Sequence, residues 1–92
     1  MPTYLVERFV PRAEGAELAG IARAVAAAAR QSGPGTVRCV AVTLVPGDEF
    51  CYLIFEAVSI EAVRHLHEAA QLPFVRIVET LHLAADSAAF RP

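Results

Sequence analysis

Short runs rich in β-forming residues alternate with longer runs of helical spacing, and the order of these runs is the strongest constraint on the fold of this chain. The strand-like runs cover residues 3–10, 36–45, 50–57 and 74–83, and the helix-like runs cover 14–31 and 59–71. The order is therefore βαββαβ. It predicts an α+β, ferredoxin-like sandwich, in which two helices cover one face of a four-stranded antiparallel sheet.

Residues that end or begin regular structure stand at the joints of this pattern. Pro11 ends the first strand, and the run from Ser32 to Gly35 stops the first helix. The turn from Pro46 to Glu49 predicts a hairpin, and Ser59 is a suitable N-cap for the second helix. The 92 residues make one domain, with a core at about residues 2–83 and an irregular tail at 84–92.

The strands are apolar on both sides, which a sheet with one solvated face would not be. The middle strands show this best. Residues Val40, Val42 and Leu44 alternate with Cys39, Ala41 and Val45, and residues Phe50, Tyr52 and Ile54 alternate with Cys51, Leu53 and Phe55. With 55% apolar residues in so small a chain, we expect the face away from the helices to pack against a second subunit. The predicted assembly is a homodimer of the dimeric α+β barrel type.

Charge and cysteine content exclude several classes of protein. The net charge is −2, and the eight basic residues are all arginines scattered along the chain, so nucleic acid is not an expected partner. No run is apolar and long enough to predict a membrane span or a signal sequence. We expect a cytoplasmic protein, in which Cys39 and Cys51 are buried thiols rather than metal ligands.

One histidine interrupts the apolar stripe of the second helix. Ile60, Val63, His67 and Ala70 recur three and four residues apart, so His67 should point into the core. A buried imidazole needs a partner, because an unpaired buried polar group costs about 1–3 kcal/mol. His65 lies about 200° around the same helix and should face solvent.

Glutamates on the strands are the candidate partners of His67. Glu7 points to the same side of its strand as Leu5, and Glu79 points to the same side as Ile77, so both are expected on the side of the sheet that meets the helices. Glu56, near the end of the third strand, is a further candidate. Together these four residues would suit a divalent first-row transition metal. The alternative is that Arg8, Arg64 or Arg76 neutralises the carboxylates. His82 is expected toward the dimer side or the rim.

Several short motifs resemble a known family. They are the N-terminal run from Met1 to Arg8, Phe55-Glu56-Ala57 before a Ser59-led helix, His67 six residues before Pro73, and Ile77-Val78-Glu79. Their order and spacing resemble those of small bacterial nickel-binding proteins of ferredoxin-like fold, a group otherwise described as a domain of unknown function. The resemblance implies a homodimer that binds nickel(II) or another divalent transition metal, with Glu7, Glu56, His67 and Glu79 at the matching positions.

Three hypotheses follow for the function. The first is a metal-binding protein that buffers or senses nickel rather than catalysing a reaction. The second is a dimeric α+β barrel enzyme or small-molecule-binding protein that uses His67 as general base, with a glutamate to orient it. The third is a structural dimer module without a ligand. A pocket with His67 in its wall would favour the second hypothesis, and a tight polar cluster would favour the first.

Overall fold

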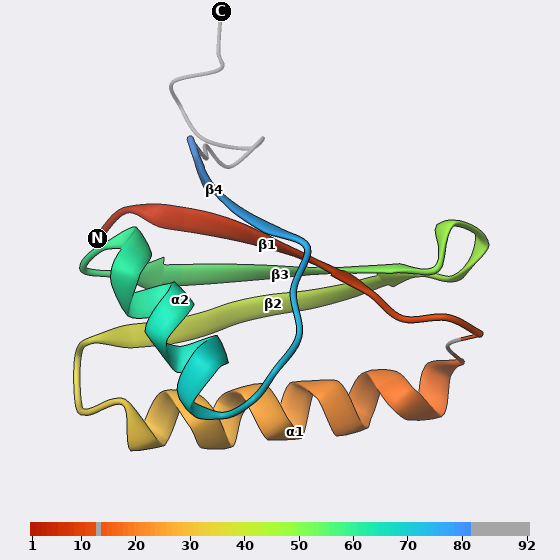
Figure 1. The fold of residues 1–92 in the computed structure, drawn as a ribbon, viewed down its shortest axis with the longest axis horizontal. Helices are drawn as coiled ribbons and strands as arrows, with labels where there is room; N and C mark the ends of the chain where they lie inside the picture. The colour runs from red at the N-terminus through yellow and green to blue at the C-terminus, as the bar shows by residue number, and fades with distance from the viewer. Residues whose placement is uncertain (13, 82–92) are drawn as a thin grey trace, which may run out of the picture.

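The computed structural model describes residues 1–12 and 14–81, and it shows the expected βαββαβ order (Figure 1). The strands are β1 (Thr3–Phe9), β2 (Val37–Val45), β3 (Phe50–Ala57) and β4 (Arg76–Thr80), and the helices are α1 (Gly15–Gln31) and α2 (Ile60–Ala69). A short 3₁₀ turn, η1 (Pro46–Asp48), joins β2 to β3. The fold is α+β and ferredoxin-like, as predicted. The predicted tail at 84–92 and His82 lie outside the described residues.

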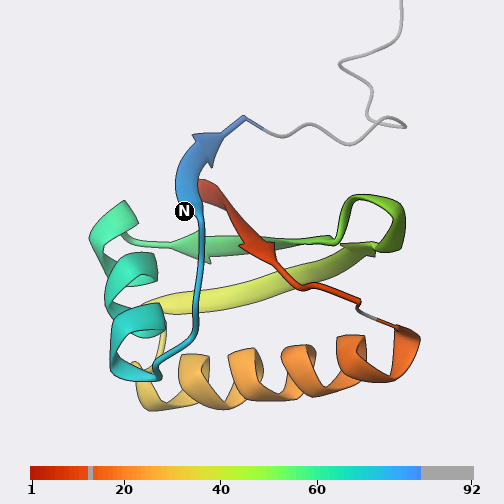
Figure 2. The ribbon, with the colours of Figure 1, turned by 45° about the vertical axis from the view of Figure 1, so that its right-hand side comes forward.

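The four strands form one antiparallel sheet in the order β2-β3-β1-β4, so the two central strands are β3 and β1. Figures 1 and 2 show α1 and α2 on the same side of this sheet. The pairing register places Glu7 of β1 directly between Tyr52 of β3 and Arg76 of β4. It also places Arg38 of β2 opposite Glu56 of β3.

The core lies between the helices and one face of the sheet. Its most deeply buried members come from alternate positions of the central strands and from both helices. They are Val6, Val25, Cys51, Leu53, Phe55, Ala57 and Val63, all with 0% of their surface exposed. Strand β1 contributes Tyr4 and Val6 to this side, so Leu5, Glu7 and Phe9 point to the other side.

This parity corrects the expectation for Glu7. We predicted that Leu5 and Glu7 would meet the helices, and the structure places them on the opposite face, together with the exposed Phe9. The sequence of β1 is apolar on both sides, so its own pattern does not determine which side is buried. The pairing with β3, whose buried side chains are Cys51 and Leu53, determines it.

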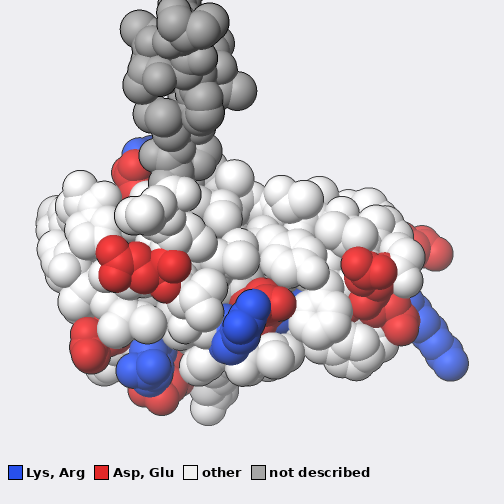
Figure 3. Space-filling model, turned by 90° about the horizontal axis from the view of Figure 1, so that it is seen from above, with Lys and Arg blue, Asp and Glu red and all other residues white. Residues whose placement is uncertain are grey.

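The sheet face away from the helices, which we call the open face, carries no helix in the described part of the chain. Its side chains follow from the register and are mostly apolar. They are Thr3, Leu5, Glu7 and Phe9 of β1, Phe50, Tyr52, Ile54 and Glu56 of β3, Arg38, Ala41, Thr43 and Val45 of β2, and Arg76, Val78 and Thr80 of β4. Figure 3 looks onto the side of the molecule opposite α1 and shows a largely uncharged surface with small, separate charged groups.

Two local features shape the elements. Strand β2 is an edge strand, and its register shifts between Cys39 and Ala41, where a bulge leaves Val40 48% exposed. Helix α2 begins at the predicted cap, since the Ser59 hydroxyl accepts a hydrogen bond from the backbone N–H of Ala62. It ends two residues earlier than predicted, at Ala69, and Gln71 adopts a positive φ of 56°.

No helix among the described residues is both long and apolar enough to cross a membrane. The cytoplasmic location stays a prediction.

Of the two thiols, Cys51 is buried as expected, whereas Cys39 is only partly covered beside the bulge.

Candidate metal centre

His67 points into the core, as the helical stripe predicts. Its side chain is 2% exposed, and its ring packs edge-on between Phe55 and Phe74, with centroid distances of 5.5 and 5.4 Å. Its partner is the carbonyl of Val63, one turn earlier in α2, which accepts a hydrogen bond of 2.8 Å from Nδ1. This bond leaves Nε2 as the nitrogen that carries the lone pair.

Burial is the largest influence on this imidazole. It lowers the pKa of His67 below the ordinary value of 6.5, and the nearby charge of Arg8 lowers this pKa further, against the opposing effect of the Val63 hydrogen bond. The neutral form is therefore favoured at pH 7, which is the form that binds a metal ion. No carboxylate contributes to the shift.

Glu7 lies on the open face and pairs with the guanidinium Nε of Arg76, its direct neighbour on β4. The Glu7 side chain is 17% exposed, so most of this carboxylate is already covered within one subunit. Arg76 is one of the three arginines proposed as neutralising partners from the sequence. At Glu7 an arginine therefore neutralises the carboxylate, which is the alternative to a metal ion considered from the sequence.

Glu56 also lies on the open face, at the end of the β1–β3 pair where it is opposite Thr3. Its carboxylate pairs with Arg38, the residue opposite it on β2. Four residues separate the levels of Glu7 and Glu56 along the sheet, which corresponds to about 13 Å at 3.3 Å per residue. The two carboxylates of one subunit are therefore too far apart to share an ion.

Glu79 lies on the predicted side of the sheet, because it is opposite Tyr4 and on the same side as Ile77, which packs on the core. Its side chain is nevertheless exposed near the end of β4. The pKa of Tyr4 is raised chiefly by burial and further by the negative charges of Glu79 and Glu61. His65 is exposed on α2, as expected.

The four predicted ligands are thus divided between two sides of the sheet. His67 is buried under the helices, Glu79 is at the exposed edge of that side, and Glu7 and Glu56 are on the open face. Across residues 1–12 and 14–81, the structure contains no cluster of three or more His, Cys, Asp or Glu side chains that could hold a metal ion. The predicted convergence does not occur within one subunit, and the residues do not fit a nickel site there.

Sequence reasoning did not place Arg8 beside His67. Arg8 lies opposite the buried Cys51 in the β1–β3 register and so belongs to the helix side of the sheet. Its charge also lowers the pKa of Cys51, although burial of the thiol has the larger effect and the net direction is upward. The sequence does contain a signal for this position. Arg8 follows Val6 by two residues, so the two side chains point to the same side of β1, and Val6 is a core residue.

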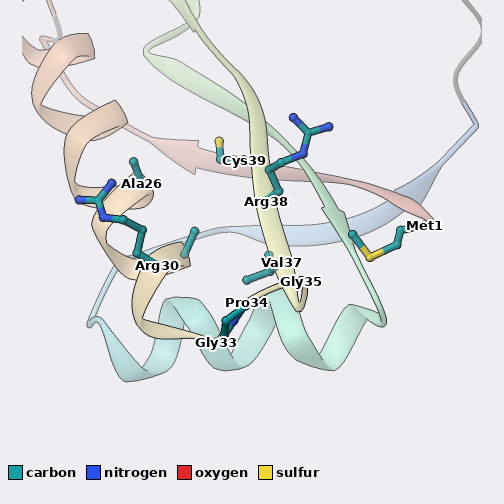
Figure 4. Close-up of a pocket in the computed structure, with 10 residues that line it drawn as sticks. Met1, Ala26, Arg30, Gly33, Pro34, Gly35, Val37, Arg38 and Cys39 are labelled. Carbon is teal, nitrogen blue, oxygen red and sulfur yellow. The ribbon is translucent and has the colours of Figure 1, made fainter.

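The largest of four cavities, with a volume of about 550 Å³, lies away from His67. It is bounded by the C-terminal half of α1 and the start of β2, and its lining includes Met1, Arg30, Pro34, Val37 and Cys39 (Figure 4). His67 lines none of the four described cavities. These cavities therefore do not support a pocket with His67 in its wall, and the described residues contain no tight polar cluster of the kind expected from the sequence.

The fold and the chemistry of these side chains define a small ferredoxin-like α+β protein, with Glu7 and Glu56 on the open face of its sheet and His67 buried on the other side. This chain belongs to the family described as nickel responsive protein SCO4226-like, whose model matches residues 4–80. The family resemblance noted in the sequence is therefore confirmed.

Among solved structures, the chain is similar to SCO4226 from Streptomyces coelicolor A3(2), with a TM-score of 0.75. The sequences are 20% identical, and the match covers 89% of this chain and 99% of that chain. At this identity the likeness shows the shared fold. No curated protein sequence matches this chain.

Proposed function

We propose that this protein is a nickel-responsive homodimer that binds a divalent transition metal ion, and that it buffers or senses the ion rather than catalysing a reaction. The observation that carries the proposal is the family match over residues 4–80. The donor types are compatible with it, because imidazole suits nickel and carboxylates extend the choice of ion.

The dimer part of the proposal rests on the open face. Its strands carry two arginines and two glutamates, paired as Arg38–Glu56 and Arg76–Glu7, so the face is electrically balanced and does not repel a second copy of itself. A twofold dimer requires such a self-complementary surface. A hollow of about 280 Å³ between Leu5, Ala41 and Ile54 offers space for side chains of the second copy.

An arginine introduced at Ile54 tests this interface. The substitution Ile54→Arg places an unpaired charge in the middle of the open face, and we expect monomers at concentrations where the natural protein sediments as a dimer. Ala69→Arg is the matched control, because Ala69 is exposed at the end of α2, on the helix side of the sheet. A natural protein that sediments as a monomer would overturn the dimer.

We place the metal ligands of this proposal on the open face, with Glu7 and Glu56 as the carboxylates. Dimerisation through this face brings the glutamates of two subunits into one interface, which one subunit alone does not do. The competing ligand set is His67 with Glu79 on the helix side, the other two of the four predicted positions. Titration of variants separates the two sets.

The experiment is a calorimetric titration of untagged protein with nickel, zinc and cobalt at neutral pH, preceded by measurement of its metal content. We expect stoichiometric nickel binding that weakens at least about tenfold in Glu7→Gln and Glu56→Gln. Glu68→Gln, on the exposed side of α2, is the control. Loss in His67→Ala with retention in Glu7→Gln would move the site to the helix side, and absence of binding by the natural protein would overturn the proposal.

A structural dimer module without a metal is the second candidate. The observation that favours it is that both open-face glutamates already have arginine partners, so neither needs a metal ion to balance its charge. This candidate predicts a stable dimer that takes up no nickel in the same titration.

A further inference from the structure

Arg8 is a charged group that the proposed metal site does not use. Its guanidinium belongs to the helix side of the sheet, opposite Cys51 and near enough to His67 to lower the pKa of both side chains. The described residues give it no ion pair, and its Nε–H is buried without a hydrogen-bond partner. A buried donor on a charged group without a partner carries a desolvation penalty, so its neighbours and the space around it are informative.

The immediate neighbours of Arg8 do not supply a negative charge. Burial keeps the Cys51 thiol protonated by raising its pKa, and burial keeps the His67 imidazole neutral by lowering its pKa. The Nδ1 of His67 is already engaged with the Val63 carbonyl. Neither of these two neighbours therefore carries a negative charge that could pair with Arg8.

A cavity of about 340 Å³ opens at Arg8, between β1, α1 and the segment after α2. This volume is at the lower end of the usual range for small-molecule cavities. Val10, Ile21, Ala24 and Leu72 give it apolar walls, and Gly20 contributes no side chain. Glu17, which is exposed in the first turn of α1, is the acidic residue of the lining.

We propose that this cavity binds a small aliphatic monocarboxylate, anchored by the guanidinium of Arg8. The guanidinium offers a planar fork of donors that matches a carboxylate. Because Nε is buried, the terminal Nη groups are the donors that would bind a carboxylate in the cavity. The apolar walls suit an aliphatic chain. Glu17 disfavours a second negative charge, which selects against dicarboxylates and phosphate.

The site is distinct from the proposed metal ligands on the open face, because Arg8 and the cavity lie on the helix side of the sheet. It also does not require His67 to act as a base. Binding of a carboxylate here can therefore be measured on protein without added metal.

The test is a titration with butyrate, isovalerate and hexanoate, followed by calorimetry and by the NMR signal of the Arg8 Nε–H group. We expect saturable binding that shifts this signal, with succinate, phosphate and the neutral butyramide binding at least about tenfold more weakly. The absence of a shift with every monocarboxylate, or equal binding of butyramide, would overturn the proposal.

Variants of Arg8 test the anchor. Arg8→Met should abolish binding and Arg8→Lys should weaken it about tenfold, because lysine keeps the charge but loses the fork. Arg64→Met, an exposed arginine of α2, should leave it unchanged. Glu17→Gln should retain monocarboxylate binding and gain affinity for succinate. Binding that persists in Arg8→Met would overturn the proposal.

A steric variant covers the case in which the Arg8 variants do not fold. A Cβ built at Gly20 meets only the end of the Arg23 side chain, at 4.0 Å. Gly20→Leu should therefore fill the cavity and abolish binding with Arg8 still in place, whereas Gly20→Ala should bind as the natural protein does. Equal binding by both Gly20 variants would show that the ligand lies elsewhere.

Discussion

The two faces of the sheet differ in how they treat charge. On the open face each glutamate has an arginine as its cross-strand neighbour, so charges are paired locally among half-exposed apolar side chains. On the helix side, the buried imidazole of His67 and the guanidinium of Arg8 have no carboxylate partner in the described residues. The two faces therefore differ in what could complete them. The open face has room for a second subunit, and Arg8 on the helix side has no ion-pair partner among the described residues.

Truncation of matched leucines should give the largest contrast between the faces. Leu53 is 0% exposed on the helix side, whereas Leu5 is only partly buried on the open face. We expect Leu53→Ala to lower the free energy of unfolding by about 2–5 kcal/mol, because it leaves a cavity in a packed core. Leu5→Ala should cost clearly less in urea denaturation at low protein concentration, and equal losses would show that the open face is already covered.

The acid sensitivity of the helix side should be the next largest effect. Because burial lowers the pKa of His67 in the folded state, the unfolded state binds more protons as the pH falls through the ordinary value of 6.5. Stability should therefore be highest above this value and decline below it. His67→Leu should flatten the decline between pH 7 and pH 5, measured by urea denaturation at each pH. His65→Leu, on the exposed side of α2, is the matched control, and an unchanged slope in His67→Leu would contradict the assignment.

Removal of the arginines on the open face should give the smallest effect. Arg38→Gln breaks a pair whose side chains are 65% and 35% exposed, and Arg76→Gln breaks a pair in which Glu7 is only 17% exposed. Pairs at the surface contribute about 0–1 kcal/mol and weaken with salt. We expect Arg76→Gln to cost more than Arg38→Gln in low-salt denaturation. The reverse order would mean that Glu7 has another partner.

The sequence predicted the order of elements well, because each segment carries its own signal. The Ser59 cap, the turn after Val45 and the inward position of His67 depend on neighbours within one turn or one hairpin, and all three are present. Helix α2 has a polar side and an apolar side, so the direction of His67 could be read from spacing alone.

The candidate site could not be predicted in the same way, because it depends on which side of β1 is buried. Leu5 and Val6 are equally apolar, and a shift of one residue exchanges the two faces. The choice is made by pairing with β3, a contact between residues far apart in the chain. This long-range contact placed Glu7 on the open face and brought Arg8 beside His67.

The bulge in β2 has a consequence for the behaviour of the protein at high concentration. A straight edge strand of nine residues, rich in valine, would be a template for another strand and a starting point for fibrils. The register shift between Cys39 and Ala41 interrupts that template near its middle and turns Val40 outward. A chain with this much apolar surface can thus keep one edge of its sheet from recruiting further copies, which favours closed assemblies over open-ended ones.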